Sequence, residues 1–181
     1  MRLGEIPIQT IEGKPAKLDD YRGKVLLVVN VASKCGLTKQ YDALEHLYES
    51  KRGEGLAVLG FPANNFKGQE PGTNEEIAEF CTSKFNVQFP MFAKLSVEGE
   101  DQHPLYAALT AAQPKAEGVG SFALKLALFH RQKKPEDVLW NFEKFLISRD
   151  GEVVRRFAPN LEPDDPAITA AIDAELAKAA P

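Results

Sequence analysis

A nearly unbroken apolar run, Val25–Val31, constrains the fold of this chain more than any other feature. Such a run, with Asn30 as its only polar residue, is typical of a strand that is covered on both faces. From residue 38, apolar residues recur at spacings of three and four, which predicts an amphipathic helix that ends near Gly53. A second apolar run, Leu56–Pro62, predicts another strand. The order strand, helix, strand implies a parallel pair joined by a right-handed crossover.

The later segments predict three more helices. Thr73 and Glu76 have the spacing of a capping box, which starts a helix, and Pro104 fits the first turn of a short helix through Ala112. Near the end of the chain, Asp164 or Asp165 is expected to cap a last helix. A weaker helical signal covers residues 122–129.

The dipeptide Asp150-Gly151 lies between two apolar stretches and predicts a hairpin, because its turn requires a positive φ. A parallel strand pair and an antiparallel hairpin together predict an α/β fold, with a mixed central sheet and helices on both faces. No repeat or interdomain linker interrupts this pattern. We therefore expect residues 1–181 to form a single domain.

Composition excludes several classes of function. The chain has 181 residues, of which 44% are hydrophobic and 27% charged, so it can bury a core without a disulfide or a structural metal. Its formal net charge of −4 argues against a nucleic-acid partner. No apolar run approaches the roughly 20 residues of a membrane helix, and the N-terminus lacks the pattern of a secretory signal. We expect a cytoplasmic protein, in whose reducing compartment two thiols are more often catalytic than structural.

Cys35 is the first candidate for chemistry. A free cysteine is often just a small buried apolar residue. Cys35, however, follows a predicted strand and precedes a predicted helix, where backbone N–H groups and the helix dipole favour the nucleophilic thiolate. The sequence Cys35-Gly36-Leu37-Thr38 has the layout of a C-x-x-C motif with Thr38 in the second cysteine position. Any resolving thiol must therefore come from elsewhere in the chain.

Three separated segments carry a family resemblance. Residues 30–38, which include Cys35, resemble the nucleophile segment of the glutathione peroxidase family. Residues 61–72 resemble its glutamine loop, and residues 140–146 resemble its Trp-Asn segment. The resemblance extends from about residue 5 to 165 and implies a thioredoxin-like fold. It also implies an active-site tetrad, Cys35, Gln69, Trp140 and Asn141.

The residue types of this tetrad suit peroxide chemistry. A thiolate that attacks an O–O bond expels an alkoxide or hydroxide, so the site needs groups that stabilise negative charge. The amides of Gln69 and Asn141 and the indole of Trp140 are neutral hydrogen-bond donors. Considered alone, Gln69 would be a turn residue and Trp140 a core residue. Their occurrence together with Cys35 favours the catalytic interpretation.

Cys81 has two interpretations. Its place on the apolar side of a predicted helix is compatible with a packed core thiol. The resemblance instead implies a resolving thiol: Cys35 becomes a sulfenic acid, Cys81 condenses with it, and thioredoxin reduces the disulfide. A disulfide requires Cα atoms within about 7 Å, so this helix would have to unwind locally if the two residues lie further apart.

The leading hypothesis is a thiol peroxidase that reduces hydrogen peroxide and organic hydroperoxides, with thioredoxin as reductant. Glutathione is the alternative reductant. Two alternatives belong to other classes of function: a redox-sensing relay protein and a non-catalytic thioredoxin-fold binding domain. We expect no cofactor and no metal, because the three histidines are scattered and lack ligand spacing. Residues 113–137 show no clear counterpart of the assembly loops of oligomeric animal members, which favours a monomer.

Some residues depart from the family pattern. Ala63, Asn64 and Asn65 replace a Cys-Asn-Gln sequence that is frequent in non-animal members, so a third thiol is missing. Lys67 stands where the family often has glycine. Finally, a basic cluster of Arg131, Lys133 and Lys134 is most often a solvated loop, although such a patch could attract an anionic partner or a lipid headgroup.

Overall fold

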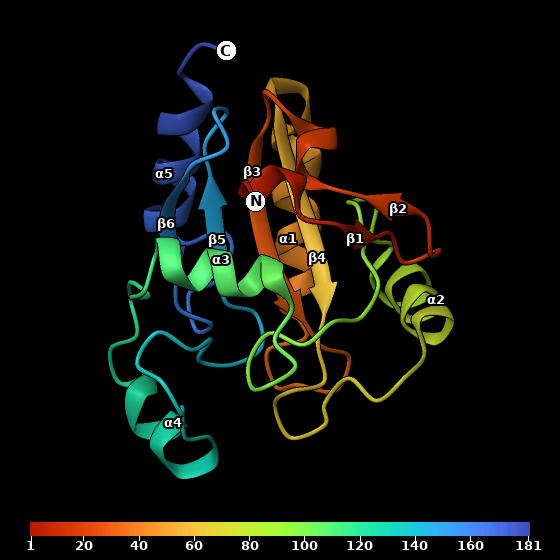
Figure 1. Ribbon diagram of the computed structural model, residues 1–181, viewed down its shortest axis with the longest axis vertical. Helices are drawn as coiled ribbons and strands as arrows, with labels where there is room; N and C mark the ends of the chain where they lie inside the picture. Colours follow the sequence, from red (N-terminus) through yellow and green to blue (C-terminus); the bar gives the residue numbers. More distant parts are fainter.

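A computed structural model describes residues 1–181 and has a four-stranded mixed sheet at its centre (Figure 1). The strands are β3 (Val25–Val31), β4 (Leu56–Pro62), β5 (Lys144–Ile147) and β6 (Val153–Phe157), in the order β4-β3-β5-β6. Strands β3 and β4 are parallel, and the other two pairs are antiparallel. The predicted strand-helix-strand unit and the predicted hairpin are therefore both confirmed.

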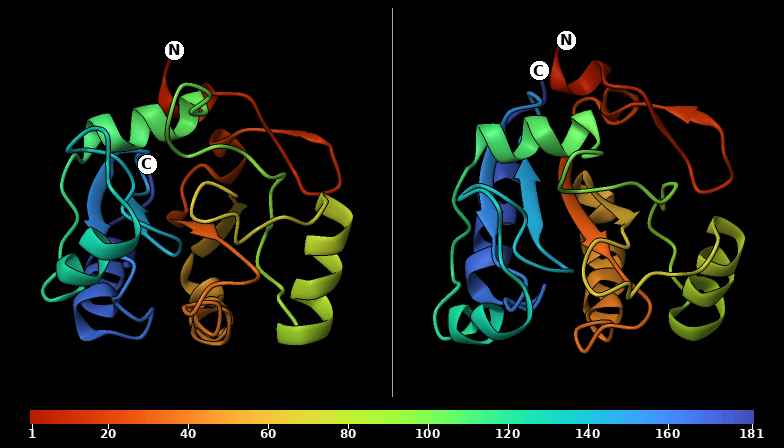
Figure 2. Two further views of the ribbon diagram at one scale, coloured as in Figure 1. Left: turned by 90° about the horizontal axis from the view of Figure 1, so that it is seen from below. Right: turned by 60° about the horizontal axis from the view of Figure 1, so that its bottom comes forward.

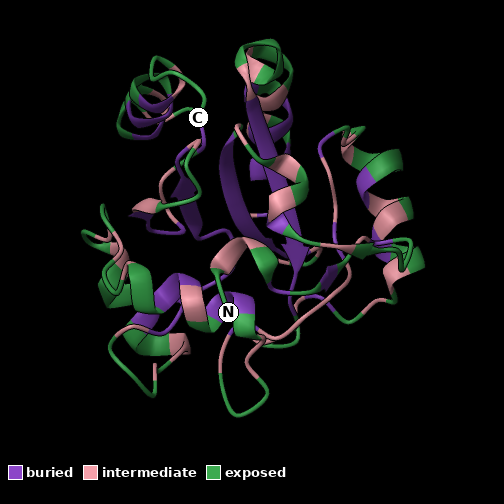
Figure 3. Cartoon of the chain, turned by 45° about the horizontal axis from the view of Figure 1, so that its top comes forward, coloured by how far each residue is buried: buried purple, intermediate pink, exposed green.

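Helices cover both faces of this sheet, as predicted. Helices α1 (Gln40–Lys51) and α5 (Pro166–Leu176) lie on one side, and α3 (Pro104–Ala112) lies on the other (Figure 2). Alternate residues of β3 belong to the two cores: Leu27 packs in the cluster that includes α1 and α5, and Leu26 packs in the cluster that includes α3. Every residue of β3 and β4 is buried (Figure 3). This two-sided burial explains why both strands are continuous apolar runs.

The remaining elements surround this frame. Helix α2 (Asn74–Phe85) follows β4, and α4 (Phe122–Phe129) follows α3. A short N-terminal hairpin, for which the sequence pattern makes no prediction, is formed by strands of two residues each. Short 3₁₀ turns complete the chain, which contains no helix long and apolar enough to cross a membrane. The hairpin strands and 3₁₀ turns are β1 (Ile8–Gln9), β2 (Pro15–Ala16), η1 (Leu3–Glu5), η2 (Leu18–Tyr21) and η3 (Arg52–Glu54).

The predicted capping box at Thr73 is present, whereas the turn between β5 and β6 differs from the predicted one. Thr73 Oγ1 accepts the N–H of Glu76 at 3.2 Å, and the Glu76 carboxylate accepts the N–H of Thr73 at 3.0 Å, which completes the capping box. In the β5–β6 turn, Gly151 has φ +87°, whereas Asp150 does not have a positive φ. The connection is consequently longer than a two-residue turn and is closed by a hydrogen bond from Ser148 N–H to the carbonyl of Glu152.

The structure decides between the two candidate caps of α5. The carboxylate of Asp165 accepts the N–H of Ala167 at 2.9 Å, whereas Asp164 is exposed. We expect Asp165→Ala to lower the free energy of unfolding by about 1 kcal/mol. Asp164→Ala is the matched control and should change it by less than about 0.5 kcal/mol. Urea unfolding followed by circular dichroism measures both, and equal losses would contradict the assignment.

Candidate active site

The loop that carries Cys35 is held by its own side chains. The N–H of Cys35 donates to Thr38 Oγ1 at 2.9 Å, and that hydroxyl donates to the carbonyl of Ala32 at 2.8 Å. The N–H of Leu37 donates to Cys35 Sγ at 3.3 Å. The side chain of Cys35 is half-buried, so its sulfur has one fixed hydrogen-bond donor and remains partly open to solvent. Thr38 therefore orders the loop from the position that a second cysteine has in a C-x-x-C motif.

One expectation about Cys35 needs correction. The sequence places this residue directly before the helix, but α1 begins only at Gln40. The intervening residues form consecutive turns, with N–H groups of Gln40 and Tyr41 bonded to the carbonyls of Leu37 and Thr38. The hydroxyl of Thr38 bonds within the loop and so does not cap the helix. The donor at the sulfur is accordingly a turn N–H and not one from the first turn of α1.

The part of the glutamine loop that follows β4, residues 63–72, is bonded to the Cys35 loop at two consecutive positions. The N–H of Lys34 donates to the carbonyl of Gln69 at 3.0 Å, and the N–H of Ser33 donates to Glu70 Oε1 at 3.1 Å. Glu70 is buried, and this burial raises the pKa of its carboxyl group. These bonds hold the backbone of Gln69 against Lys34, the residue that precedes Cys35.

Asn64, which matches the family pattern, and Asn65, which departs from it, both have structural roles in this loop. Asn64 Oδ1 accepts the N–H of Glu70 at 2.9 Å, and Asn65 Oδ1 accepts the N–H of Val97 at 2.9 Å. Lys67 has φ +53°, a conformation in which glycine is the least strained residue. The backbone at this position is therefore left-handed, although the residue is lysine.

The Trp-Asn segment lies against the glutamine loop. Asn141 Nδ2 donates to Gln69 Oε1 at 2.9 Å, which leaves the Nε2 amide of Gln69 available as a donor. Trp140 is 5% exposed, and its ring lies 5.2 Å from that of Phe66 and 4.7 Å from that of Phe129, measured between centroids. The structure therefore joins Gln69 and Asn141 directly, and it connects Gln69 to the Cys35 loop through Lys34.

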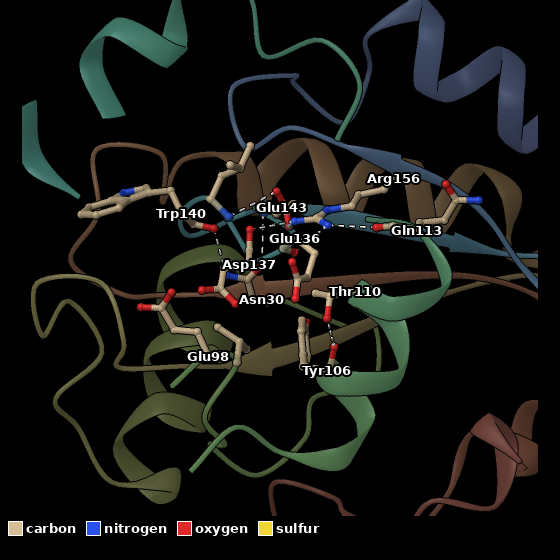
Figure 4. A network of polar contacts seen from close by, with 12 residues as sticks. Asn30, Glu98, Tyr106, Thr110, Gln113, Glu136, Asp137, Trp140, Glu143 and Arg156 are labelled. Atoms are coloured by element: carbon tan, nitrogen blue, oxygen red, sulfur yellow. Dashed lines mark hydrogen bonds and ion pairs between the residues drawn. The ribbon is translucent and has the colours of Figure 1, made fainter. Parts of the chain in front are cut away.

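Asn30 holds the Trp-Asn segment in place, a role that the sequence analysis does not assign to it. From within β3, its Nδ2 donates to the carbonyl of Trp140 at 3.1 Å, and its Oδ1 accepts the N–H of Glu143 at 3.2 Å (Figure 4). The N–H of Phe142, which has φ +68°, donates to the carbonyl of Asn30 at 2.6 Å. The only polar residue of the first apolar run thus connects the strand before Cys35 with the segment that carries Trp140.

A buried ion pair supports the same segment from behind. Arg156 Nη2 lies 2.9 Å from Glu143 Oε2, and both side chains are almost completely buried. The guanidinium also donates to three backbone carbonyls, those of Gln113, Glu136 and Asp137 (Figure 4). Burial raises the pKa of Glu143 to about 7, against the opposing effect of Arg156. These contacts join the segment to β6 and to the chain on either side of α4.

Cys81 is a buried, free thiol in this conformation. It belongs to α2, is 2% exposed and packs in the same cluster as Ile77 and Tyr41. Burial raises the pKa of its thiol to about 11. Both cysteines are free, so the structure does not join Cys35 to Cys81. A thiol with this acidity is protonated at neutral pH and is a poor nucleophile.

A half-exposed cysteine after the first strand of a mixed α/β sheet defines a thioredoxin-fold thiol protein. Comparisons with known proteins specify its family. The model of the glutathione peroxidase family matches residues 4–110. The chain is 48% identical over 174 residues to the thioredoxin/glutathione peroxidase BtuE of Escherichia coli K12, covering 94% of this chain and 95% of the relative. A glutathione peroxidase of Lactococcus lactis is 45% identical over 155 residues, covering 86% and 88%.

This chain belongs to the glutathione peroxidase family, and it is a peroxidase. Solved structures agree. The crystal structure of Trgpx in apo form is 35% identical with a TM-score of 0.73 and covers 100% of this chain and 99% of that one. The crystal structure of T. cruzi GPX1 is 34% identical, with a TM-score of 0.67 and 97% coverage of both chains. A DsbE thiol:disulfide interchange protein of Chlorobium tepidum, 17% identical with a TM-score of 0.59, shares the thioredoxin-like fold alone.

The position of Asn30 yields a testable prediction. Asn30→Ala removes two side-chain hydrogen bonds to the segment of Trp140 and should lower the free energy of unfolding by about 2 kcal/mol. Because Trp140 is the only tryptophan, its fluorescence reports on this segment. We expect emission at longer wavelength as the indole becomes hydrated.

The control for this prediction is Gln40→Ala. Gln40 is also fully buried, but its side-chain amide donates to the carbonyl of Pro159 and makes no bond to Trp140 or Glu143. This variant should lose stability and keep the emission of the wild type. If the emission of Asn30→Ala equals that of Gln40→Ala, Asn30 does not hold the segment.

Proposed function

We propose that this peroxidase reduces hydrogen peroxide and organic hydroperoxides through Cys35, with Gln69, Trp140 and Asn141 completing the site. The observation that carries the proposal is the direct connection of the half-exposed Cys35 loop to Gln69, and of Gln69 to Asn141. The three segments involved are far apart in the sequence. Residues 1–181 are proposed to form one peroxidase domain.

The first step is a displacement at oxygen. The thiolate of Cys35 attacks one oxygen of the peroxide, so that an S–O bond forms and the O–O bond breaks. The sulfur is oxidised to a sulfenic acid, and the peroxide is reduced to water or an alcohol after the leaving oxygen takes up a proton. Since Gln69 Oε1 is occupied by Asn141, its Nε2 group can donate to the sulfur or to the leaving oxygen.

The second step is condensation with Cys81. The Cys81 thiolate attacks the sulfur of the sulfenic acid, an S–S bond forms, the S–O bond breaks, and the departing hydroxide takes up the proton released by Cys81 to leave as water. In the folded helix Cys81 is buried and protonated, so α2 must open first. Two observations support opening: Ile77 and Cys81 are the only buried residues of this helix, and a hollow of about 290 Å³ lies between Ser33-Lys34 and Phe80.

The third step restores both thiols. A dithiol reductant exchanges with the 35–81 disulfide and becomes oxidised itself. We propose thioredoxin for this role, and the name of the Escherichia coli relative, which includes both thioredoxin and glutathione, supports a choice between these two. A monomer in the cytoplasm is proposed as the working form of the enzyme.

Steady-state turnover tests the proposed function. NADPH consumption with thioredoxin, thioredoxin reductase and peroxide should be sustained, and faster than with glutathione and its reductase. Cys35→Ser should abolish it, and Gln69→Ala should slow the oxidation of Cys35 about 10²-fold, as loss of a stabilising donor does elsewhere. The matched control is Gln9→Ala, which alters an exposed glutamine outside the site. Consumption that stops after one equivalent would contradict the enzyme and favour a redox sensor.

The role of Cys81 has its own test. Because burial raises its pKa to about 11, Cys81 in the reduced folded protein should resist iodoacetamide at pH 8, whereas Cys35 should react. After one equivalent of peroxide, mass spectrometry should find a disulfide between residues 35 and 81. Cys81→Ser should instead accumulate the sulfenic acid of Cys35. Persistent sulfenic acid in the wild type would exclude the resolving role.

The same burial predicts a pH effect on stability. The pKa of the Cys81 thiol is about 11 in the folded state and about 9 in the unfolded state. The protonated thiol therefore contributes its full stabilisation below pH 9, and this contribution is lost as the pH rises from 9 to 11. The free energy of unfolding of the reduced wild type should therefore fall more steeply over this range than that of Cys81→Ala.

A further inference from the structure

Helix α4 presents two large apolar side chains to solvent. Leu124 and Leu128 are 74% and 88% exposed, and Met1 is the only other large hydrophobic residue with such exposure. Their spacing of four places them on one face of the helix. Figure 1 shows α4 at the periphery, at the same end of the sheet as the loops that follow β3 and β4. The two leucines therefore form an apolar ridge on a projecting element.

The orientation of this ridge is fixed by packing on the opposite side of the helix. Leu126 is 6% exposed and belongs to the core cluster that contains Trp140, and Phe122 and Phe129 pack against the same cluster. The ring of Phe129 contacts that of Phe122 as well as Trp140. Because this side of α4 is packed against the core, the helix must turn Leu124 and Leu128 toward solvent. Solvent exposure of both leucines is a stable property of the fold.

The segment that contains the ridge carries only positive charge, and the neighbouring carboxylate of Glu98 pairs with His130. Residues 118–134 contain four basic residues and no acidic one, although the whole chain has a net charge of −4. All four are exposed, and none forms an ion pair with a carboxylate. They are Lys125, Arg131, Lys133 and Lys134. Unpaired cations beside exposed leucines are the composition of a helix that lies in a membrane interface.

We propose that α4 and the basic segment after it dock this protein onto an anionic lipid surface. Leu124 and Leu128 would enter the boundary between headgroups and acyl chains, while the four cations bind lipid phosphates. A second copy of the chain is a poorer occupant, because two leucines on a convex ridge supply much less than the roughly 800 Å² per partner of a stable interface. Like positive charges on two such ridges would also repel each other.

Docking by α4 would place the site at the lipid surface. The helix ends at Phe129 and His130, whose rings lie 4.7 and 5.6 Å from that of Trp140, and Lys67 of the glutamine loop lies over Phe129 at 5.8 Å. The docking proposal does not depend on the proposed function, since lipid binding can be measured without peroxide. Failure of one would leave the other intact.

Co-sedimentation with vesicles tests the proposal on the full-length protein. We expect binding to vesicles that contain phosphatidylglycerol, much weaker binding to pure phosphatidylcholine, and a loss of binding as salt screens the charges. Leu124→Ser with Leu128→Ser, and separately Lys133→Gln with Lys134→Gln, should each weaken binding about tenfold or more. The control pair Lys14→Gln with Lys17→Gln removes exposed charges elsewhere and should leave it unchanged.

Several outcomes would overturn the proposal. These are no binding to anionic vesicles, equal weakening by the control pair, or equal binding to both kinds of vesicle. Competition by millimolar glycerol phosphate would indicate a site for free phosphate instead of a lipid surface. A dimer in sedimentation velocity that is lost in Leu124→Ser with Leu128→Ser, without vesicle binding, would assign the ridge to a second copy.

Discussion

The hydrogen bonds of one buried amide, Asn30, connect the strand that leads to Cys35 with the segment that carries Trp140 and Asn141. Because the Asn30 side chain is fully buried, its amide must be satisfied by protein groups, and leaving it unsatisfied would be costly. Its two side-chain bonds therefore specify one position of the segment. The direct bond between Asn141 and Gln69 depends on that position.

Parallel pairing brings the other parts together. Strands β3 and β4 are paired along their full length, from Val25 opposite Leu56 to Val31 opposite Pro62. Both strands consequently end at the same edge, where the Cys35 loop and the glutamine loop start. The backbone bonds of Ser33 and Lys34 to Glu70 and Gln69 are a consequence of this common edge.

The sequence predicts most of this architecture because the hydrophobic pattern and the caps are local signals. The strands, the capping box at Thr73 and the helix at Pro104 follow from neighbouring residues alone. The predicted start of α1 at residue 38 is wrong, since the helix begins at Gln40. Apolar periodicity does not show that the hydroxyl of Thr38 bonds inside the loop. The choice of Asp165 over Asp164 likewise needed the geometry of the chain.

The candidate site is predictable only in part. Cys35 is indicated by its place between strand and helix, and Gln69, Trp140 and Asn141 by their occurrence with it in a family pattern. Asn30 and the pair of Glu143 with Arg156 were missed, because a buried polar residue acquires its role from partners distant in the sequence. The lone asparagine in the apolar run was the available signal, since burial of an amide demands partners.

Thr38 has a kinetic consequence for the proposed cycle. With threonine in the second position of the motif, the oxidised sulfur has no thiol within its own loop, and its lifetime is set by how often α2 opens. During this interval a second peroxide competes with Cys81 and converts the sulfenic acid irreversibly to a sulfinic acid. In the proposed cycle, resistance to inactivation by excess substrate would depend on how readily α2 opens, and a change that makes α2 more rigid would prolong the exposure of the sulfenic acid to further peroxide.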